Sequence, residues 1–248
     1  MIKTIMICIV MICYSQRTLA QHYNNVIKIN SDIELISLKD SIFIHKNWFE
    51  FGQSGRFSSN GLIFIKNGNA ILVNTPCNNE QTAQLYSYLR DSMNVMIQKL
   101  IVCHFHIDCL GGIEFIQEQG IESIGLDLTK KICIEKDLAY PSTTFQDKLE
   151  FAFEGEKLIC QYFGPGHTLD NIVVYFPNDK ILYGGCLVKS LSANNLGNTD
   201  DAVVDKWGST IEKLQKTYKN IEFVIPGHGE FGSTDLLKHT ISLLGQGK

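Results

Sequence analysis

The side chains best suited to chemistry are concentrated in residues 103–112, Cys-His-Phe-His-Ile-Asp-Cys-Leu-Gly-Gly. His104, His106 and Asp108 occupy alternate positions where the buried-strand pattern of residues 99–102 ends. Two imidazoles and a carboxylate on one short turn of backbone can converge on a single point, as the ligands of a metal ion must. The structural alternative is a pair of core histidines beside a solvated aspartate, and the other strand ends decide between the two.

Three further candidate ligands follow other strand-like runs. His167 lies in Gly-Pro-Gly-His-Thr, Cys186 in Gly-Gly-Cys-Leu-Val-Lys, and His228 in Pro-Gly-His-Gly. Together with the first motif they make six ligands, more than one tetrahedral zinc can use. Two sets of three would leave coordination positions open for water, as catalytic zinc sites require. The sequence therefore predicts a catalytic centre with two metal ions.

This order of ligands resembles the metallo-β-lactamases of class B, subclass 1. The resemblance covers essentially the whole chain after residue 20 and rests on His-x-His-x-Asp at residues 104–108, followed by His167, Cys186 and His228. The cysteine ligand distinguishes this subclass from hydrolases of the glyoxalase II type in the same superfamily, because those hydrolases have a bridging Asp at that position. They also have a His directly after the motif Asp, where this chain has Cys109.

The resemblance implies two Zn²⁺ per chain, in sites of different charge. The first zinc would be bound by His104, His106 and His167, and the second by Asp108, Cys186 and His228. Neutral imidazoles leave the first zinc its full charge, so that a bound water should have a pKa of about 7. A carboxylate and a thiolate make the second zinc a milder Lewis acid, suited to stabilising an anion. The implied reaction is attack of a metal-bound hydroxide on the lactam amide of β-lactam antibiotics, including carbapenems, which would confer antibiotic resistance.

Asp108, Lys189 and Asn195 are the expected catalytic residues. Lys189 follows Cys186 by three positions and matches a lysine of the family that orients the carboxylate beside the reacting amide. Asn195 matches an asparagine of the family that helps to polarise the lactam carbonyl. The alternative for Asn195, which precedes Leu-Gly, is a purely local role in a turn.

Two further features concern substrate and metal binding. Phe49 and Phe51 lie in residues 48–57, which match the hairpin that covers substrate in the family, and both are expected substrate contacts. Filling of the aromatic core is the alternative for these two. Asn74 stands where many members of the family have an Asp near the zinc pair. Loss of that carboxylate changes the hydrogen bonding of the ligands, so the metal affinity and substrate range of the family apply less directly to this chain.

Residues 1–20 have the pattern of a secretory signal peptide. Lys3 supplies the positive charge, residues 5–14 the apolar segment and residues 18–20 a small-residue cleavage site. The apolar run is shorter than the roughly 20 residues that a membrane span needs. We therefore expect a periplasmic protein with no membrane attachment after cleavage, in which residues 21–248 form one metallo-β-lactamase domain.

Composition narrows the classes of partner. With 248 residues, of which 44% are hydrophobic, the chain can bury a sizeable core. The formal charge of −4 and the lack of Lys-rich or Arg-rich runs give no basic surface for nucleic acid. Six cysteines follow residue 20, and their spacing matches no small disulfide framework. We expect a monomer whose partner is a small-molecule β-lactam.

Apolar periodicity predicts strands followed by helices, in the same order in two halves. In the first half, about residues 21–140, strands are expected at 34–45, 61–65, 70–73, 99–102 and 123–126, and helices at 79–93, 113–119 and 128–138. In the second, about residues 141–248, strands are expected at 149–153, 157–163, 171–176, 180–187 and 223–225, and helices at 203–218 and 234–244. Two β-sheets face to face with helices outside, an α/β fold, is the architecture implied. It agrees with the αββα sandwich of the resembled family.

Two other functions remain as alternatives. A different secreted di-zinc hydrolase, acting on an ester or thioester, would use the same ligands, and the combination of Cys186 with Lys189 favours lactams over it. A non-catalytic zinc-binding protein is the second alternative. Two sites with three ligands each argue against it, because storage or structural sites are closed.

Overall fold

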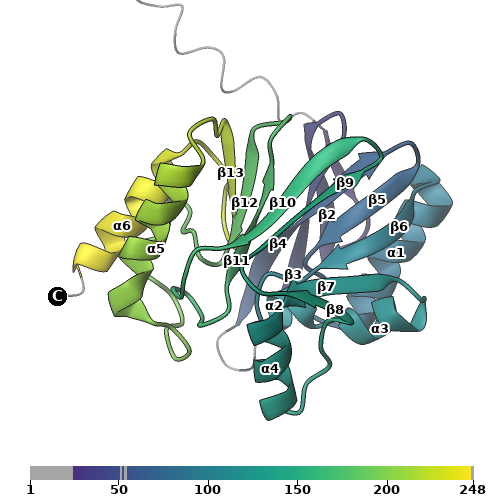
Figure 1. The fold of residues 1–248 in the computed structure, drawn as a ribbon. Coiled ribbons are helices and arrows are strands. Elements are labelled where there is room, and N and C mark those ends of the chain that lie inside the picture. The colour runs from purple at the N-terminus through teal and green to yellow at the C-terminus, as the bar shows by residue number, and fades with distance from the viewer. Residues whose placement is uncertain (1–24, 51, 53–54, 247–248) are drawn as a thin grey trace, which may run out of the picture.

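Two β-sheets packed face to face, with helices on their outer faces, make up the protein (Figure 1). The computed structural model describes residues 25–50, 52 and 55–246. The first sheet has eight strands in the order β1 to β8, and the second has five in the order β13-β12-β11-β10-β9. The predicted αββα sandwich is therefore confirmed. The expected signal peptide lies outside the described residues.

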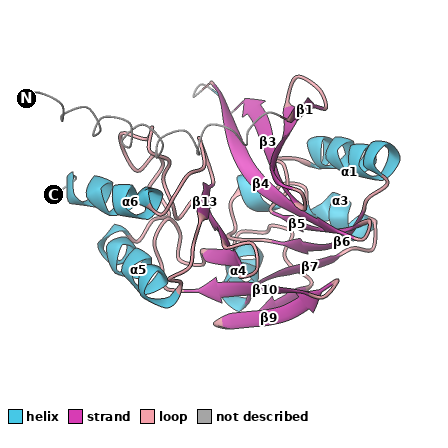
Figure 2. Ribbon diagram, turned by 90° about the horizontal axis from the view of Figure 1, so that it is seen from above, coloured by secondary structure: helices cyan, strands magenta, loops and turns pink. Residues whose placement is uncertain are grey.

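The first sheet and its helices take up the chain as far as residue 145. They comprise β1 (Val26–Lys28), β2 (Ile33–Lys39), β3 (Ile42–Glu50), β4 (Arg56–Lys66), β5 (Asn69–Val73), α1 (Asn79–Met93), β6 (Met96–Ile101), α2 (Ile107–Leu110), α3 (Ile113–Glu118), β7 (Glu122–Leu126), α4 (Asp127–Glu135) and β8 (Thr143–Phe145). The second sheet follows with β9 (Lys148–Phe153), β10 (Glu156–Tyr162), β11 (Ile172–Phe176), β12 (Ile181–Gly185), α5 (Val204–Thr217), β13 (Phe223–Pro226) and α6 (Asp235–Gln246). Helices α1 and α3 cover one side of the sandwich, and α5 and α6 the other (Figure 2).

One predicted strand is wrong. Residues 34–45 form parts of two antiparallel strands, β2 and β3, which pair with Ile36 opposite Ile44. The chain reverses at the turn of Asp40 and Ser41, and apolar alternation continues on both sides of that turn, so periodicity alone did not reveal it. The chain also reverses at Asn67 and Gly68 between β4 and β5, where both residues have positive φ (52° and 76°) as a two-residue hairpin turn requires.

The space between the sheets is an apolar core. The ring of Phe64 on β4 lies 5.5 Å from that of Phe176 on β11 and 6.2 Å from that of Phe153 on β9, measured between centroids. A second cluster lies on the outer face of the five-stranded sheet, where Trp207 and Ile211 of α5 are fully buried. Burial of this apolar surface holds each sheet against its neighbour and fixes the edges where the strands end. Among the described residues, no helix is long and apolar enough to cross a membrane.

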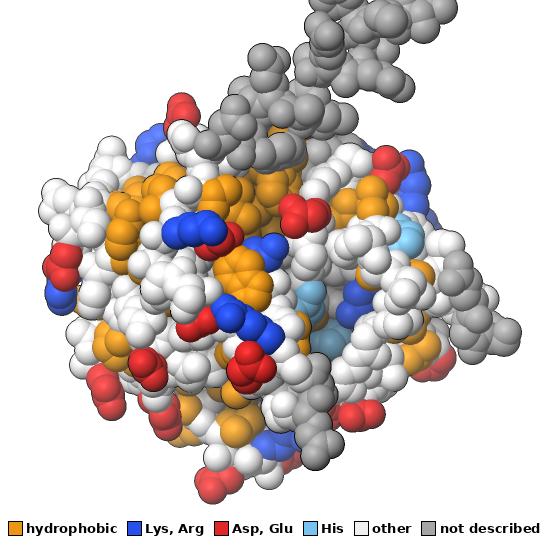
Figure 3. All heavy atoms as spheres, turned by 180° about the vertical axis from the view of Figure 1, so that it is seen from behind, with side chains coloured by type: hydrophobic (Ala, Val, Ile, Leu, Met, Phe, Trp, Pro, Cys, Tyr) orange, Lys and Arg blue, Asp and Glu red, His pale blue; other side chains and the backbone are white. Residues whose placement is uncertain are grey.

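Strand ends from both sheets meet along one edge of the sandwich. β6 runs parallel to β5 and β7, and β12 runs parallel to β13, so the loops that follow these strands leave in common directions. Two backbone hydrogen bonds join the sheets there: Ile172 N donates to Cys103 O (2.9 Å), and Asn60 N donates to Gly227 O (2.8 Å). On one face of the molecule, histidine side chains lie in a hollow beside a Lys or Arg side chain (Figure 3).

Candidate metal centre

Asp108, Cys186 and His228 form a group that we call the Asp-Cys-His cluster. One ligand atom of each lies within 4.8 Å of the others. The Cys186 Sγ lies 3.0 Å from Asp108 Oδ2, and His228 Nε2 lies 3.2 Å from that oxygen and 3.5 Å from the sulfur. These separations are close to those between ligands around one tetrahedral metal ion, so the three residues can share an ion.

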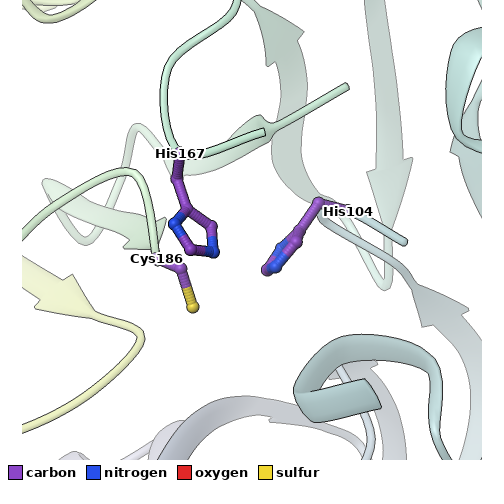
Figure 4. A group of neighbouring side chains, drawn as sticks. All are labelled: His104, His167 and Cys186. Carbon is purple, nitrogen blue, oxygen red and sulfur yellow. The ribbon is translucent and has the colours of Figure 1, made fainter. Parts of the chain in front are cut away.

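His104, His106 and His167 lie beside it and are called here the three-histidine cluster. Their ring centroids are 4.7, 5.0 and 5.1 Å apart, and His106 Nδ1 lies 3.2 Å from His167 Nε2. His104 and His167 also point with Cys186 toward one shared space (Figure 4). The two clusters are therefore adjacent, and the structure brings all six predicted ligands into one site.

Glycines allow the ligand loops to approach closely. A Cβ at Gly111 would lie 2.3 Å from Cys77 O, and one at Gly112 would lie 1.8 Å from Thr82 Oγ1, so the segment after Asp108 packs where no side chain fits. A Cβ at Gly227 would lie 2.3 Å from Cys186 Sγ. The loop that carries His228 can thus pass directly against the thiol. The sequence did not predict α2, a helix of four residues that places Asp108 in its first turn.

Burial and neighbouring charges set the protonation of the ligands. Burial lowers the pKa of His104 to about 3 and that of His167 well below its usual value, which keeps both imidazoles neutral and able to bind a cation. Burial also disfavours the charged form of His228, but Cys186 and Asp108 outweigh it and raise the pKa of His228. The pKa of Asp108 is lowered because His228 and His104 outweigh the effect of its burial. Without metal, a proton on His228 therefore balances the negative charge, and metal binding would displace that proton.

Most of the histidines are oriented through the ring nitrogen that faces away from the metal site. Cys109 Sγ lies 3.0 Å from His104 Nδ1, and Asp201 Oδ2 lies 2.9 Å from His106 Nε2. His228 Nδ1 is 2.8 Å from the carbonyl oxygen of Ser58. Such partners hold an imidazole in one orientation. Sequence reasoning missed Asp201, which lies 95 positions from His106, and Ser58, which contributes only its backbone.

Lys189 lies next to both clusters. Its ammonium lies 5.3 Å from the centroid of the Trp207 ring, and its backbone N–H donates to Thr240 Oγ1 (2.9 Å). Burial lowers the pKa of Lys189, while the negative charges of Cys186 and Asp108 oppose that shift. The side chain therefore places a partly desolvated positive charge at the edge of the metal site.

Of the other predicted substrate contacts, Asn195 lies in an exposed turn and Phe49 lies in an aromatic pair near His228. Asn195 is exposed, its Oδ1 accepts from Gly197 N (2.8 Å) and its Nδ2 donates to Asn194 Oδ1 (3.0 Å), so the carboxamide takes part in a local turn. Phe49 packs edge-on against Phe57 across the β3–β4 hairpin at a centroid distance of 4.3 Å. The Phe57 ring lies 6.2 Å from that of His228, which puts this aromatic pair beside the metal ligands. The predicted contact Phe51 lies outside the described residues.

The donor atoms suit zinc. Imidazole nitrogen, thiolate sulfur and carboxylate oxygen are the three kinds of ligand that Zn²⁺ takes in proteins, whereas Mg²⁺ and Ca²⁺ prefer oxygen alone. A family model described as the metallo-beta-lactamase superfamily matches residues 54–228, a span that contains all six ligands. The chain belongs to the metallo-beta-lactamase superfamily. Zinc dependence is a property of that superfamily and agrees with the donor set.

Relatives in the superfamily match most of the chain. A metallo-beta-lactamase type 2 from Bacteroides fragilis is 37% identical over 220 residues, which cover 89% of this chain and 88% of the relative. The metallo-beta-lactamase IND-1 from Chryseobacterium indologenes is 30% identical, covering 84% and 86%. Among solved structures, a metallo-beta-lactamase from Pontibacter korlensis superposes with a TM-score of 0.83 at 37% identity, covering 86% of this chain and 99% of its own. These superfamily members share the fold and nearly the full length of this chain.

Proposed function

We propose that this protein is a secreted zinc-dependent β-lactamase that hydrolyses the lactam amide of β-lactam antibiotics, including carbapenems. The observation that carries the proposal is the Asp-Cys-His cluster lying directly beside the three-histidine cluster. The two clusters would bind two zinc ions per chain. Relatives that are 30 to 37% identical and carry the name metallo-beta-lactamase support the same activity.

The two clusters differ in the charge of their ligands, and this difference gives them different roles. Zinc would supply Lewis-acid chemistry and would activate water for attack on the amide. The three-histidine cluster contributes no negative charge, because imidazole is a neutral ligand, and burial keeps His104 and His167 from taking up a proton. The Asp-Cys-His cluster contributes a carboxylate and a thiolate on the other side. Nucleophile and leaving group would therefore meet different electrostatic environments within one site.

Substrate orientation is assigned to side chains around the clusters. Lys189 would bind the carboxylate that β-lactams carry beside the reacting amide, since its ammonium is partly desolvated next to the metal ligands. The hairpin that carries Phe49 and Phe51 would cover the bound substrate. Asn195 would polarise the lactam carbonyl by donating from Nδ2, which in this structure donates to Asn194 Oδ1, while its Oδ1 keeps the turn hydrogen bond from Gly197 N.

The expected location of the protein is the periplasm, and its expected partner is a small molecule. Residues 1–20 would direct secretion to the periplasm and be removed, and residues 21–248 would act as one domain and as a monomer. The net charge of −4 supports a small-molecule substrate over nucleic acid. In this proposal, resistance to β-lactams is the consequence for the cell.

Comparison of substrates by the purified mature protein tests the activity. We expect hydrolysis of a carbapenem and of a chromogenic cephalosporin, with little turnover of a glutathione thioester or an aryl ester. Faster turnover of the thioester or the ester would replace the proposal with the corresponding hydrolase. Zinc binding without turnover of any of the four would leave a non-catalytic zinc-binding protein.

A further inference from the structure

A chain of buried hydrogen bonds links the loops that carry the candidate metal ligands. Cys103 N donates to Asn74 Oδ1 (2.9 Å), Asn74 Nδ2 donates to the Tyr183 hydroxyl (2.9 Å), and this hydroxyl donates to the carbonyl oxygen of Asn60 (2.6 Å). Asn60, Asn74 and Tyr183 are each 3% exposed or less. Polar groups buried this deeply are costly unless all of them are paired, so the chain of hydrogen bonds is rigid once formed.

One end of this chain of hydrogen bonds is attached to the first ligand loop. Cys103 directly precedes His104, and Asn74 therefore holds the backbone at the start of the loop that also carries His106 and Asp108. Tyr183 lies on β12, three residues before Cys186.

The other end is attached to the loop of His228. Asn60 Nδ2 donates to Pro226 O (3.0 Å) and to Gly229 O (2.8 Å), and Asn60 N donates to Gly227 O (2.8 Å). Three backbone carbonyls around His228 are thus fixed by one residue. The three chain segments that supply the Asp-Cys-His cluster are therefore joined through Asn74, Tyr183 and Asn60, although they come from both sheets.

We propose that Asn74 and Tyr183 are positioning residues for the Asp-Cys-His cluster, and that the pair works only with an amide at position 74. This inference rests on the metal-binding role proposed above for that cluster. Neither side chain binds the metal. Their role is to hold the loops of Asp108, Cys186 and His228 at the separation that lets the three ligands share one ion.

The direction of donation explains why an amide is needed. The Tyr183 hydroxyl has one proton, which it gives to the carbonyl oxygen of Asn60, so it must accept a hydrogen bond from residue 74. Asn74 supplies that proton from Nδ2. An ionised aspartate at this position would offer only acceptors, and the single Tyr183 proton would then face two of them. One of the two buried acceptors would remain unpaired and would keep the full penalty of its desolvation.

The backbone of Asn74 is held in place independently. Its φ is 61°, in the left-handed region that asparagine tolerates better than most residues. His45 Nε2 is 3.1 Å from Asn74 O and donates to it, because His45 Nδ1 accepts from Asn47 Nδ2 (2.8 Å). Gly61 leaves room for this imidazole, since a Cβ there would lie 1.9 Å from His45 Nε2. The Asn74 side chain therefore has a fixed direction, as a positioning residue requires.

Tyr183→Phe removes the hydroxyl and tests the proposal. The measurement is a cobalt(II) titration of the metal-free protein, in which the thiolate-to-cobalt absorption band reports the ion bound to Cys186. We expect the affinity reported by this band to fall by about 10-fold or more, the usual effect of losing a partner that orients metal ligands. Binding to the three-histidine cluster should change little.

Tyr175→Phe is the matched control. Tyr175 also donates its hydroxyl to a backbone carbonyl, that of Asn220 (3.0 Å), but it lies on β11 among the residues packed against α5, outside the chain of hydrogen bonds. Thermal unfolding of both metal-free variants measures their loss of stability. If Tyr183→Phe keeps the cobalt affinity of the wild type, or if Tyr175→Phe loses as much, the proposal is wrong.

A second variant tests the direction of the hydrogen bonds. Asn74→Asp should weaken the thiolate-linked cobalt site, and adding Tyr183→Phe to it should cause little further loss, because both changes break the same link. Fully additive losses would overturn the pairing of the two residues. The titration uses metal and no substrate, so failure of this inference and failure of the proposed β-lactamase activity would appear in different assays.

Discussion

The Cys186 sulfur lies 3.0 Å from Asp108 Oδ2 although 78 positions separate the two residues. Asp108 belongs to α2, beyond the end of β6 in the first sheet, and Cys186 follows β12 in the second. The contact therefore spans the interface between the sheets, and His228 after β13 completes the group. Because both sheets contribute ligands, a metal bound to the Asp-Cys-His cluster would stabilise the folded sandwich as well as the site.

Replacing Cys186 with Ser should remove the strongest ligand of the Asp-Cys-His cluster. A neutral hydroxyl is a much poorer ligand for zinc than a thiolate. We expect this site to empty or weaken while the three-histidine cluster keeps its ion, as measured by native mass spectrometry and hydrolysis rates. Unchanged zinc content and activity in Cys186→Ser would reject the assignment of the thiolate. Cys160→Ser, a change of a buried cysteine on β10, is the control and should keep full zinc content.

The wild-type protein should bind two zinc ions per chain. Six ligands lie in two adjacent clusters, and each cluster offers three donor atoms. Native mass spectrometry at saturating zinc checks the number directly. A single tightly held ion at saturation would contradict the prediction and would show that the clusters act as one site.

Lys189→Ala should raise KM for β-lactams that carry the ring carboxylate. A hydrogen bond to a charged group contributes about 1.5–3 kcal/mol, which corresponds to an increase in KM of about 10-fold or more. The turnover number should change less, because the contact is present in both the bound substrate and the transition state. An analogue with an esterified carboxylate is the control. An equal effect of the substitution on that analogue would show that Lys189 acts in another way.

Stability of the metal-free protein should fall as the pH decreases from 6.5 to 4. Burial lowers the pKa of His45 to about 4, so the unfolded chain takes up a proton near pH 6.5 that the folded protein refuses until about pH 4. The stability conferred by neutral His45 is thus present above pH 6.5 and lost below it, by about 3 kcal/mol. Equilibrium unfolding checks this loss in the wild type and in His45→Gln. His104 and His167 act in the same direction and His228, whose pKa is raised, acts in the opposite one. All three are present in both proteins, so the difference between the two proteins isolates His45, and parallel curves would contradict the prediction.

Much of the site could be predicted because its ligands follow strand ends. The His-x-His-x-Asp motif and the single residues His167, Cys186 and His228 each stand directly after an apolar run. A strand that ends at a sheet edge delivers the next side chain to that edge, so sequence order alone placed the ligands near one another. The two sheets could be predicted for the same reason, since apolar periodicity marks most of their strands.

What sequence reasoning missed depends on contacts between distant segments. Asp201 contacts His106 from a loop with no apolar pattern, and Tyr183 reads as one more residue of a buried strand. The importance of Asn74 was visible only as a departure from the family. Its function became visible once the hydrogen bonds to Cys103 and Tyr183 were located. Hydrogen-bond partners far apart in the chain leave no periodic signal.

Dependence of carbapenem hydrolysis on metal tests the central claim most directly. The measurement is the initial rate of the purified mature protein before chelation, in excess EDTA, and after zinc is restored, with mass spectrometry of the protein during turnover. We expect EDTA to abolish the activity, zinc to restore it, serine-directed inhibitors to have no effect, and no covalent adduct to form, because we assign the six ligands to metal binding and the chain contains no Ser-x-x-Lys sequence. Full turnover in excess chelator, or a serine-linked adduct formed during turnover, would contradict the account.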